Sequence, residues 1–146
     1  FKMTIYAKRL TDTAKLPKRT TPGSAGYDIF SDDEDFVLNP GETKIVSTGI
    51  AIENNDIRSA IMIYPRSGLA CKYNITLANC VGIVDSDYRG EVCVGLCNVS
   101  NKPYTIEPNE RVAQMVIAPV SLMNVEEVSS LEDTVRGEGG FGSTGV

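Results

Sequence analysis

Short runs of β-branched and apolar residues, separated by turn residues, constrain the fold of this chain more than any other feature. Such runs fall at residues 43–52, 59–64, 75–84, 91–99, 104–106 and 111–120. Glycine and proline stand at almost every junction, and no amphipathic run reaches the usual length of a helix. This pattern is typical of all-β sandwiches and barrels. We therefore expect an all-β fold in which about two turns after Ser67 form one short helix.

The C-terminal residues 136–145 read RGEGGFGSTG and cannot contribute to a core, because glycine fills five of the ten positions. The same segment carries an arginine, an aromatic ring and two hydroxyl groups. Two interpretations stand beside each other: a disordered, solubilising tail, or a flexible segment that orders over a phosphorylated ligand with a ring. We place a single β domain at residues 1–130 and this tail at residues 131–146.

The overall charge and length limit the possible partners. With 146 residues one domain is expected, and a net charge of −5 argues against nonspecific binding to nucleic acid or to an anionic membrane. An anionic ligand would need basic residues that are concentrated locally. No apolar stretch is long enough to span a bilayer and no targeting segment is visible, so we expect an intracellular protein of the cytoplasm or nucleus.

The four cysteines, at positions 71, 80, 93 and 97, form no C-x-x-C pair, and the chain has no histidine. This composition argues against a zinc site and favours reduced, buried thiols. Both faces of the run at residues 91–99 are apolar or small, so we expect this strand to be covered on both sides. Without histidine, proton transfer near neutral pH must use a carboxylate or a perturbed lysine.

Four further segments carry residues that a core would not choose. Residues 22–28 form a small-residue loop that ends in an aromatic ring and a carboxylate, and residues 65–68 supply an arginine and a hydroxyl at the expected helix start. Residues 82–90 join two apolar strands, and Gln114 lies inside an apolar strand. Each has an ordinary structural interpretation when taken alone: a loop, a capped turn, a polar hairpin tip and a structural hydrogen bond.

In this order, however, the five segments AGYD, PRSG, GIVDSDYRG, ERVAQ and RGEGGFGSTG resemble the five motifs of the trimeric dUTP pyrophosphatases, the dUTPase family. The resemblance covers residues 22–145 and departs from the usual pattern at Asn109-Glu110, where the family commonly has Gly-Asp. We expect that change to affect a turn and not the chemistry. The resemblance implies a jelly-roll-like all-β subunit and a homotrimer whose active sites are shared between subunits, each closed by a tail.

The activity that this resemblance implies is the Mg²⁺-dependent hydrolysis of dUTP to dUMP and pyrophosphate, which keeps uracil out of DNA and supplies dUMP. Asp85 would be the general base that activates a water for in-line attack on the α-phosphate, with Gln114 and Ser67 as further catalytic residues. Mg²⁺ would be held mainly by the triphosphate, with Asp28 in contact through water. The implied phosphate-binding residues are Arg66, Ser67, Gly68, Gln114, Arg136, Gly142, Ser143 and Thr144.

The base and sugar would lie in the hairpin around residues 79–93, according to the same resemblance. Tyr88 would pack on the deoxyribose and exclude a 2′-hydroxyl, and Phe141 would stack on uracil. The implied uracil- and deoxyribose-binding residues are Asn79, Gly82, Ile83, Val84, Asp85, Tyr88, Cys93 and Phe141. Two alternatives remain at this point: a dCTP deaminase-like enzyme of the same fold, and a non-catalytic interaction module on that fold.

Overall fold

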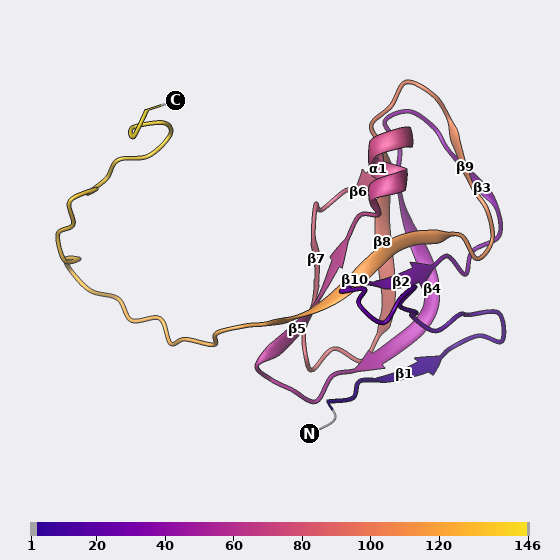
Figure 1. Cartoon of the computed structure of the whole chain (residues 1–146), viewed down its shortest axis with the longest axis horizontal. Coiled ribbons are helices and arrows are strands. Elements are labelled where there is room, and N and C mark those ends of the chain that lie inside the picture. The colour runs from indigo at the N-terminus through magenta and orange to yellow at the C-terminus, as the bar shows by residue number, and fades with distance from the viewer. Residues whose placement is uncertain (1–2, 146) are drawn as a thin grey trace.

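The computed structural model describes residues 3–145, and the regular secondary structure of this part consists of ten strands and one short helix (Figure 1). The elements are β1 (Tyr6–Arg9), β2 (Tyr27–Phe30), β3 (Phe36–Leu38), β4 (Thr43–Glu53), β5 (Ser59–Tyr64), α1 (Ser67–Tyr73), β6 (Ile75–Leu77), β7 (Gly82–Val84), β8 (Glu91–Asn98), β9 (Tyr104–Ile106) and β10 (Arg111–Pro119). The prediction of an all-β fold with one short helix after Ser67 is confirmed.

Two four-stranded sheets form the body, with strand orders β1-β4-β8-β6 and β2-β10-β5-β7, and β3 pairs with β9 in a separate ribbon. Alternate residues of the long strands are buried, as expected for strands with one face on a core. These buried side chains form one hydrophobic cluster. Its largest fully buried members are Ile29, Leu38, Ile50, Ile61, Ile75, Leu96, Ile106 and Met115.

Three details of the strand pattern differ from the prediction. The run at residues 75–84 is two strands, because a turn in which Cys80 N–H donates to Leu77 O at 3.2 Å separates β6 from β7. The two strands therefore lie in different sheets. The prediction also missed the short strands β1, β2 and β3, whose three or four residues are too few to show a periodic pattern.

The prediction that β8 is covered on both faces, and that the cysteines are buried, is wrong for this chain. Val92, Val94 and Leu96 are buried, but Cys93 on the opposite face is exposed. Cys71 and Cys80 are exposed as well, and Cys97 is half-buried. All four thiols are free, as predicted. Small residues on the outer face of β8 therefore reflect something other than burial within one subunit.

Beyond β10 the chain leaves the body as an extended arm (Figure 1). Residues 121–138 are exposed, and residues 120–145 contain no strand or helix. The hydrogen bonds of the final glycine-rich segment join near neighbours, such as Arg136 Nε to Gly139 O at 2.9 Å. No helix among the described residues is long and apolar enough to cross a membrane. Closure of the tail over a ligand stays a prediction.

A β-bulge in β4 requires glycine at position 49 for two reasons, its backbone conformation and the lack of space around it. Gly49 lies where the register with β8 shifts, and its φ of +66° is unfavourable for other residues. A Cβ there would lie 2.5 Å from Asp32 Oδ2 and 2.7 Å from the Ala14 Cβ. Asp32 cannot move easily, since its carboxylate accepts hydrogen bonds from the hydroxyls of Thr11 and Thr13.

We expect Gly49→Ala to lower the free energy of unfolding by about 3 kcal/mol, because backbone strain and overpacking add. Gly41→Ala is the matched control, since Gly41 has a φ of +78° but open space around its Cβ position. That control should lose only about 1 kcal/mol. Urea unfolding at one fixed protein concentration measures both, and equal losses would contradict the packing argument.

Candidate phosphate and nucleotide site

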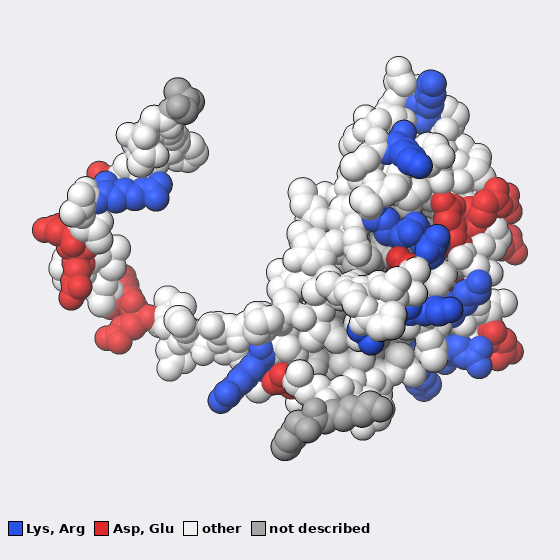
Figure 2. Space-filling model, viewed as in Figure 1, with Lys and Arg blue, Asp and Glu red and all other residues white. Residues whose placement is uncertain are grey.

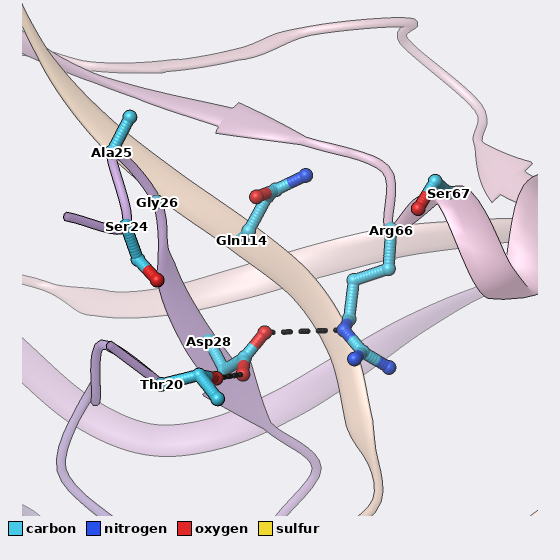
Figure 3. A pocket seen from close by; sticks show the side chains of 8 residues that line it. All are labelled: Thr20, Ser24, Ala25, Gly26, Asp28, Arg66, Ser67 and Gln114. Carbon is cyan, nitrogen blue, oxygen red and sulfur yellow. Dashed lines mark hydrogen bonds and ion pairs between the residues drawn. The ribbon is translucent and has the colours of Figure 1, made fainter.

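A pocket of about 350 Å³ opens where β2, β10 and the start of α1 meet (Figure 3). It unites three segments that the sequence singled out: the loop before β2, the turn before α1 and the polar position in β10. The lining residues are Thr20, Ser24, Ala25, Gly26, Asp28, Arg66, Ser67 and Gln114. One guanidinium, two kinds of hydroxyl and an amide face a small-residue loop, a combination that suits a phosphate group.

Asp28 organises the charges of this pocket. Its Oδ1 accepts a hydrogen bond from Arg66 Nε at 3.1 Å, and its Oδ2 lies 3.3 Å from Arg111 Nη1 and accepts from Thr20 Oγ1 at 3.2 Å. Arg66 uses Nε for this pair, so its terminal nitrogens point away from Asp28 in Figure 3. The carboxylate thus fixes one arginine at the pocket through a side-on pair, and the guanidinium keeps donors for an anion.

Gln114 lies on β10 with a neighbour on each side, opposite Asp28 of β2 and Tyr64 of β5. Its Nε2 donates to Pro65 O at 3.0 Å, which fixes the orientation of the carboxamide. Gly26 makes room for it, because a Cβ at that position would collide with Gln114 Oε1. The structural interpretation of this glutamine is therefore partly right: one end of the amide serves the fold, and the other faces the pocket.

The prediction that residues 82–90 form a hairpin is wrong, because β7 and β8 lie in different sheets and do not pair with each other. This connection between the sheets, for which we keep the name hairpin, forms a second, separate cluster of the predicted site residues. It carries Asp85 at an exposed position, and Ile83 is exposed over about two thirds of its surface. Asp85 and Ile83 line a shallow hollow of about 710 Å³, which shares no residue with the phosphate pocket. The turn is held by Tyr88 N–H, which donates to Asp85 O at 3.1 Å, and by Arg89 Nη1, which donates to Ser86 O at 2.7 Å.

The register of β7 shows how far apart the two clusters lie. Val84 pairs with Ile61 and Gly82 with Ile63, so β7 runs antiparallel to β5. Asp85 therefore follows β7 at the beginning of β5, whereas Arg66 follows the end of β5. From residue 60 to residue 66 an extended strand spans about 20 Å. The structure thus brings Asp28, Arg66, Ser67 and Gln114 together but leaves Asp85 and Tyr88 elsewhere on the same subunit.

The remaining predicted residues fall into the same division. Asn79, Gly82, Val84 and Cys93 belong to the hairpin region, and Gly82 packs tightly, since a Cβ there would lie 3.1 Å from the Ile63 Cβ. Although Cys93 is exposed, partial desolvation of its sulfur, followed by the negative charge of Glu91, raises the pKa of the thiol, which therefore stays protonated at neutral pH. Gly68 lies in α1 outside the pocket lining. The predicted tail residues Arg136, Phe141, Gly142, Ser143 and Thr144 extend away from both clusters (Figure 1).

The sequence prediction of site residues missed four that line the pocket, Thr20, Ser24, Ala25 and Gly26, and also Arg111, which pairs with Asp28. Thr20 and Ser24 lie in a loop whose only signal was its polar, small-residue composition. Arg111 was visible as part of ERVAQ, but its pairing with Asp28 depends on the alignment of β10 with β2. Figure 2 shows the outcome for the surface: Lys and Arg side chains gather over the β2 and β10 side of the body, whereas Asp and Glu gather on the arm and at the opposite edge.

Residues 3–145 contain no group of three or more His, Cys, Asp or Glu side chains that could hold a metal ion. Asp28 is already paired with two arginines, so it is poorly placed to be a direct metal ligand. A metal held mainly by ligand phosphates and water needs no such protein group. The donor set therefore fits Mg²⁺ brought in by a polyphosphate and does not fit a site made by the protein.

A jelly-roll-like sandwich whose arginine-lined pocket suits a phosphate group belongs to the class of all-β proteins with a candidate site for an anionic ligand. Comparison with known proteins narrows the class. The dUTPase family model matches residues 12–145. The deoxyuridine 5′-triphosphate nucleotidohydrolase of Neisseria meningitidis serogroup A is 47% identical, covering 99% of this chain and 95% of its own length. That of Hahella chejuensis is 49% identical, covering 97% and 94%.

A solved structure of the Staphylococcus bacteriophage 80alpha dUTPase with dUPNHPP is also similar, with a TM-score of 0.89 and 29% identity. It covers 98% of this chain and 99% of its own length. The chain therefore belongs to the dUTPase family. The resemblance inferred from the five segments is confirmed, and the jelly-roll-like fold is confirmed with it.

The pairing of Arg66 with Asp28 predicts that charge alone is insufficient in the phosphate pocket. We expect Arg66→Lys to weaken binding of inorganic pyrophosphate by about tenfold, because an ammonium cannot form the side-on pair and keep a fork of donors for the anion. Isothermal titration calorimetry measures the affinity. Arg58→Lys is the control, since among the described residues the Arg58 side chain takes part in no ion pair. Equal affinities for wild type and Arg66→Lys would contradict the assignment.

Proposed function

We propose that this chain hydrolyses dUTP to dUMP and pyrophosphate inside the cell, where deoxynucleoside triphosphates are used. The observation that carries the proposal is its membership of the dUTPase family, with relatives of 47–49% identity that are named for this activity. The phosphate pocket supports it independently, because Arg66, Ser67 and Gln114 converge there from separate elements.

In this proposal the pocket binds the phosphates, and Asp28 acts through the arginines. Arg66 neutralises charge on the triphosphate, and Ser67 donates a hydrogen bond near the α-phosphate. Gln114, whose Nε2 donates to Pro65 O, would accept a hydrogen bond from the attacking water through its carboxamide oxygen. Mg²⁺, when bound with the triphosphate, would neutralise charge and hold the phosphates for in-line attack. Asp28 holds Arg66 and Arg111 at 3.1 and 3.3 Å, and any contact that it makes with the hydrated metal is indirect.

Asp85 is the proposed general base. The chain contains no histidine, so a carboxylate or a perturbed lysine must deprotonate the attacking water, and the resemblance to the dUTPase motifs assigns this role to Asp85. Asp85 is exposed, which leaves it accessible to a ligand from outside its own subunit. The charge of a bound triphosphate would raise the pKa of a neighbouring carboxylate by like-charge repulsion and make it a better base.

The hairpin of residues 79–93 is the proposed site of the base and sugar. Asn79 and the backbone near Ile83, Val84 and Cys93 would complement the edge of uracil, and an exocyclic amine in place of the carbonyl would leave polar groups unpaired. The protonated thiol of Cys93 fits a neutral, non-nucleophilic wall. Gly82 keeps the hairpin close to Ile63 of β5, which leaves little space for a methyl group on the base.

The separation of these clusters supports the proposal of a homotrimer with shared active sites. A single nucleotide cannot contact Asp85 and Arg66 of one subunit, since β5 holds them about 20 Å apart. Cyclic symmetry can bring the hairpin of one subunit beside the phosphate pocket of the next. The extended arm and tail would then reach a site built by neighbouring subunits, where Arg136, Phe141 and residues 142–144 close over the ligand.

Shared sites predict that two inactive variants restore one another. We expect Asp85→Asn and Arg66→Ala each to lower turnover by roughly a hundredfold or more. When equal amounts are unfolded together and refolded, about a quarter of the sites should combine an intact Asp85 with an intact Arg66 from different subunits.

The measurement is the steady-state rate of pyrophosphate release from dUTP with Mg²⁺. Each variant refolded alone is the control for recovery of folded protein. A mixture with no more activity than its parts would mean that both residues serve one site from the same subunit.

If the tail closes over the ligand, its removal should lower activity without unfolding the protein. Truncation before Arg136 should leave the far-ultraviolet circular dichroism and the mass by light scattering close to those of the full chain, because residues 136–138 are exposed and bury no core surface. Turnover should fall by at least roughly a hundredfold, because ligand closure is lost. Unchanged turnover of the truncated protein would exclude a closing role.

A further inference from the structure

Tyr88 is held in one position on the hairpin by two backbone contacts. Its hydroxyl donates to Glu91 O at 2.8 Å, and its N–H donates to Asp85 O at 3.1 Å. The accepting residue is itself anchored, because Glu91 Oε1 accepts a hydrogen bond from Gly49 N at 2.8 Å. The tyrosine ring therefore folds back over the turn although nearly half of its surface is exposed.

This position exists only because residue 90 has no side chain. A Cβ at Gly90 would lie 2.5 Å from Tyr88 Oη, 2.7 Å from Cζ and 3.1 Å from Cε2. Gly90 is not among the glycines with a positive φ, so its backbone would accept alanine without strain. The need for glycine comes from the tyrosine ring and not from the shape of the turn.

We propose that Gly90 is a positioning residue that sets the sugar selectivity of the enzyme by seating the Tyr88 ring. This inference rests on the proposed function, in which Tyr88 packs on the deoxyribose. A ring held down at both ends presents one fixed wall to the sugar, so an added 2′-hydroxyl cannot be accommodated by a small ring movement. A larger residue at position 90 lifts the ring, breaks the bond to Glu91 O and opens the wall.

The variant Gly90→Ala should fold, because the atoms that must give way are the end of a partly exposed side chain and not backbone or core. We expect the ratio of kcat/KM for dUTP to that for UTP to fall by about tenfold to a hundredfold, as for loss of one well-placed contact. Gly41→Ala is the control, since a Cβ there would meet no atom within 4 Å and Gly41 lies in the turn between β3 and β4, outside the proposed site. Its ratio should equal that of the wild type.

A double-mutant cycle separates positioning of Tyr88 from a general structural effect. In a Tyr88→Ala background, Gly90→Ala should have no further effect on the dUTP to UTP ratio, because the ring through which it acts is gone. The ring resonances of Tyr88, assigned by their loss in Tyr88→Phe, should shift in the NMR spectrum of Gly90→Ala and stay in place in Gly41→Ala.

Several outcomes overturn the inference. An unchanged ratio in Gly90→Ala, unshifted ring resonances, or an equal further loss in the Tyr88→Ala background would each do so. Failure of the proposed function gives a different result: the wild type would not hydrolyse dUTP. If the wild type is active but Tyr88→Ala keeps the full dUTP to UTP ratio, the sugar contact itself is wrong and the inference fails with it.

Discussion

The register of β10 between β2 and β5 is the constraint on which the phosphate site depends. Gln114 faces Asp28 on one side and Tyr64 on the other, two residues before Arg66. A slip of one residue would turn Gln114 to the opposite face of the sheet and separate Asp28 from Arg111. The hydrophobic pattern of β10 prevents that slip, because Val112, Ala113 and Met115 are buried. Core packing thus fixes the position of the polar groups.

The sheet β2-β10-β5-β7 brings Asp28, Arg66 and Gln114 together but places Asp85 at the opposite end of β5. β7 adds to the edge of β5 in antiparallel direction, so the hairpin with Asp85 emerges at the end of β5 opposite to Arg66. Under the proposed function, one subunit with this topology cannot form a complete active site. The proposed sharing of sites between subunits also accounts for two exposed features. These are the face of β8 with the small residues Cys93 and Gly95, and the extended arm after β10; one subunit covers neither of them.

Features that depend on the local sequence pattern, such as the fold class and the helix, were predicted correctly. Features that depend on which sheet a strand joins were missed. Short runs between glycine and proline correctly gave the all-β class, and Pro65 with Ser67 correctly gave α1. The split of residues 75–84 into β6 and β7 was not predictable, because an apolar run looks alike whether it stays in one sheet or crosses to another. The double pairing of Asp28 was hidden for the same reason: its partners lie 38 and 83 residues away, one at the start of α1 and the other on β10.

The net charge of −5 and the proposed polyanionic substrate are compatible because electrostatic interactions between exposed charges are screened over about 8 Å at physiological ionic strength. Asp and Glu side chains gather mainly on the arm and at the far edge of the body, whereas basic side chains gather over β2 and β10 (Figure 2). At the pocket, the negative charge of Asp28 offsets one of the two positive charges of Arg66 and Arg111. The net charge of this group is therefore positive, and the ion pairs fix its geometry. Local arrangement, and not overall charge, therefore decides which ligands this surface attracts.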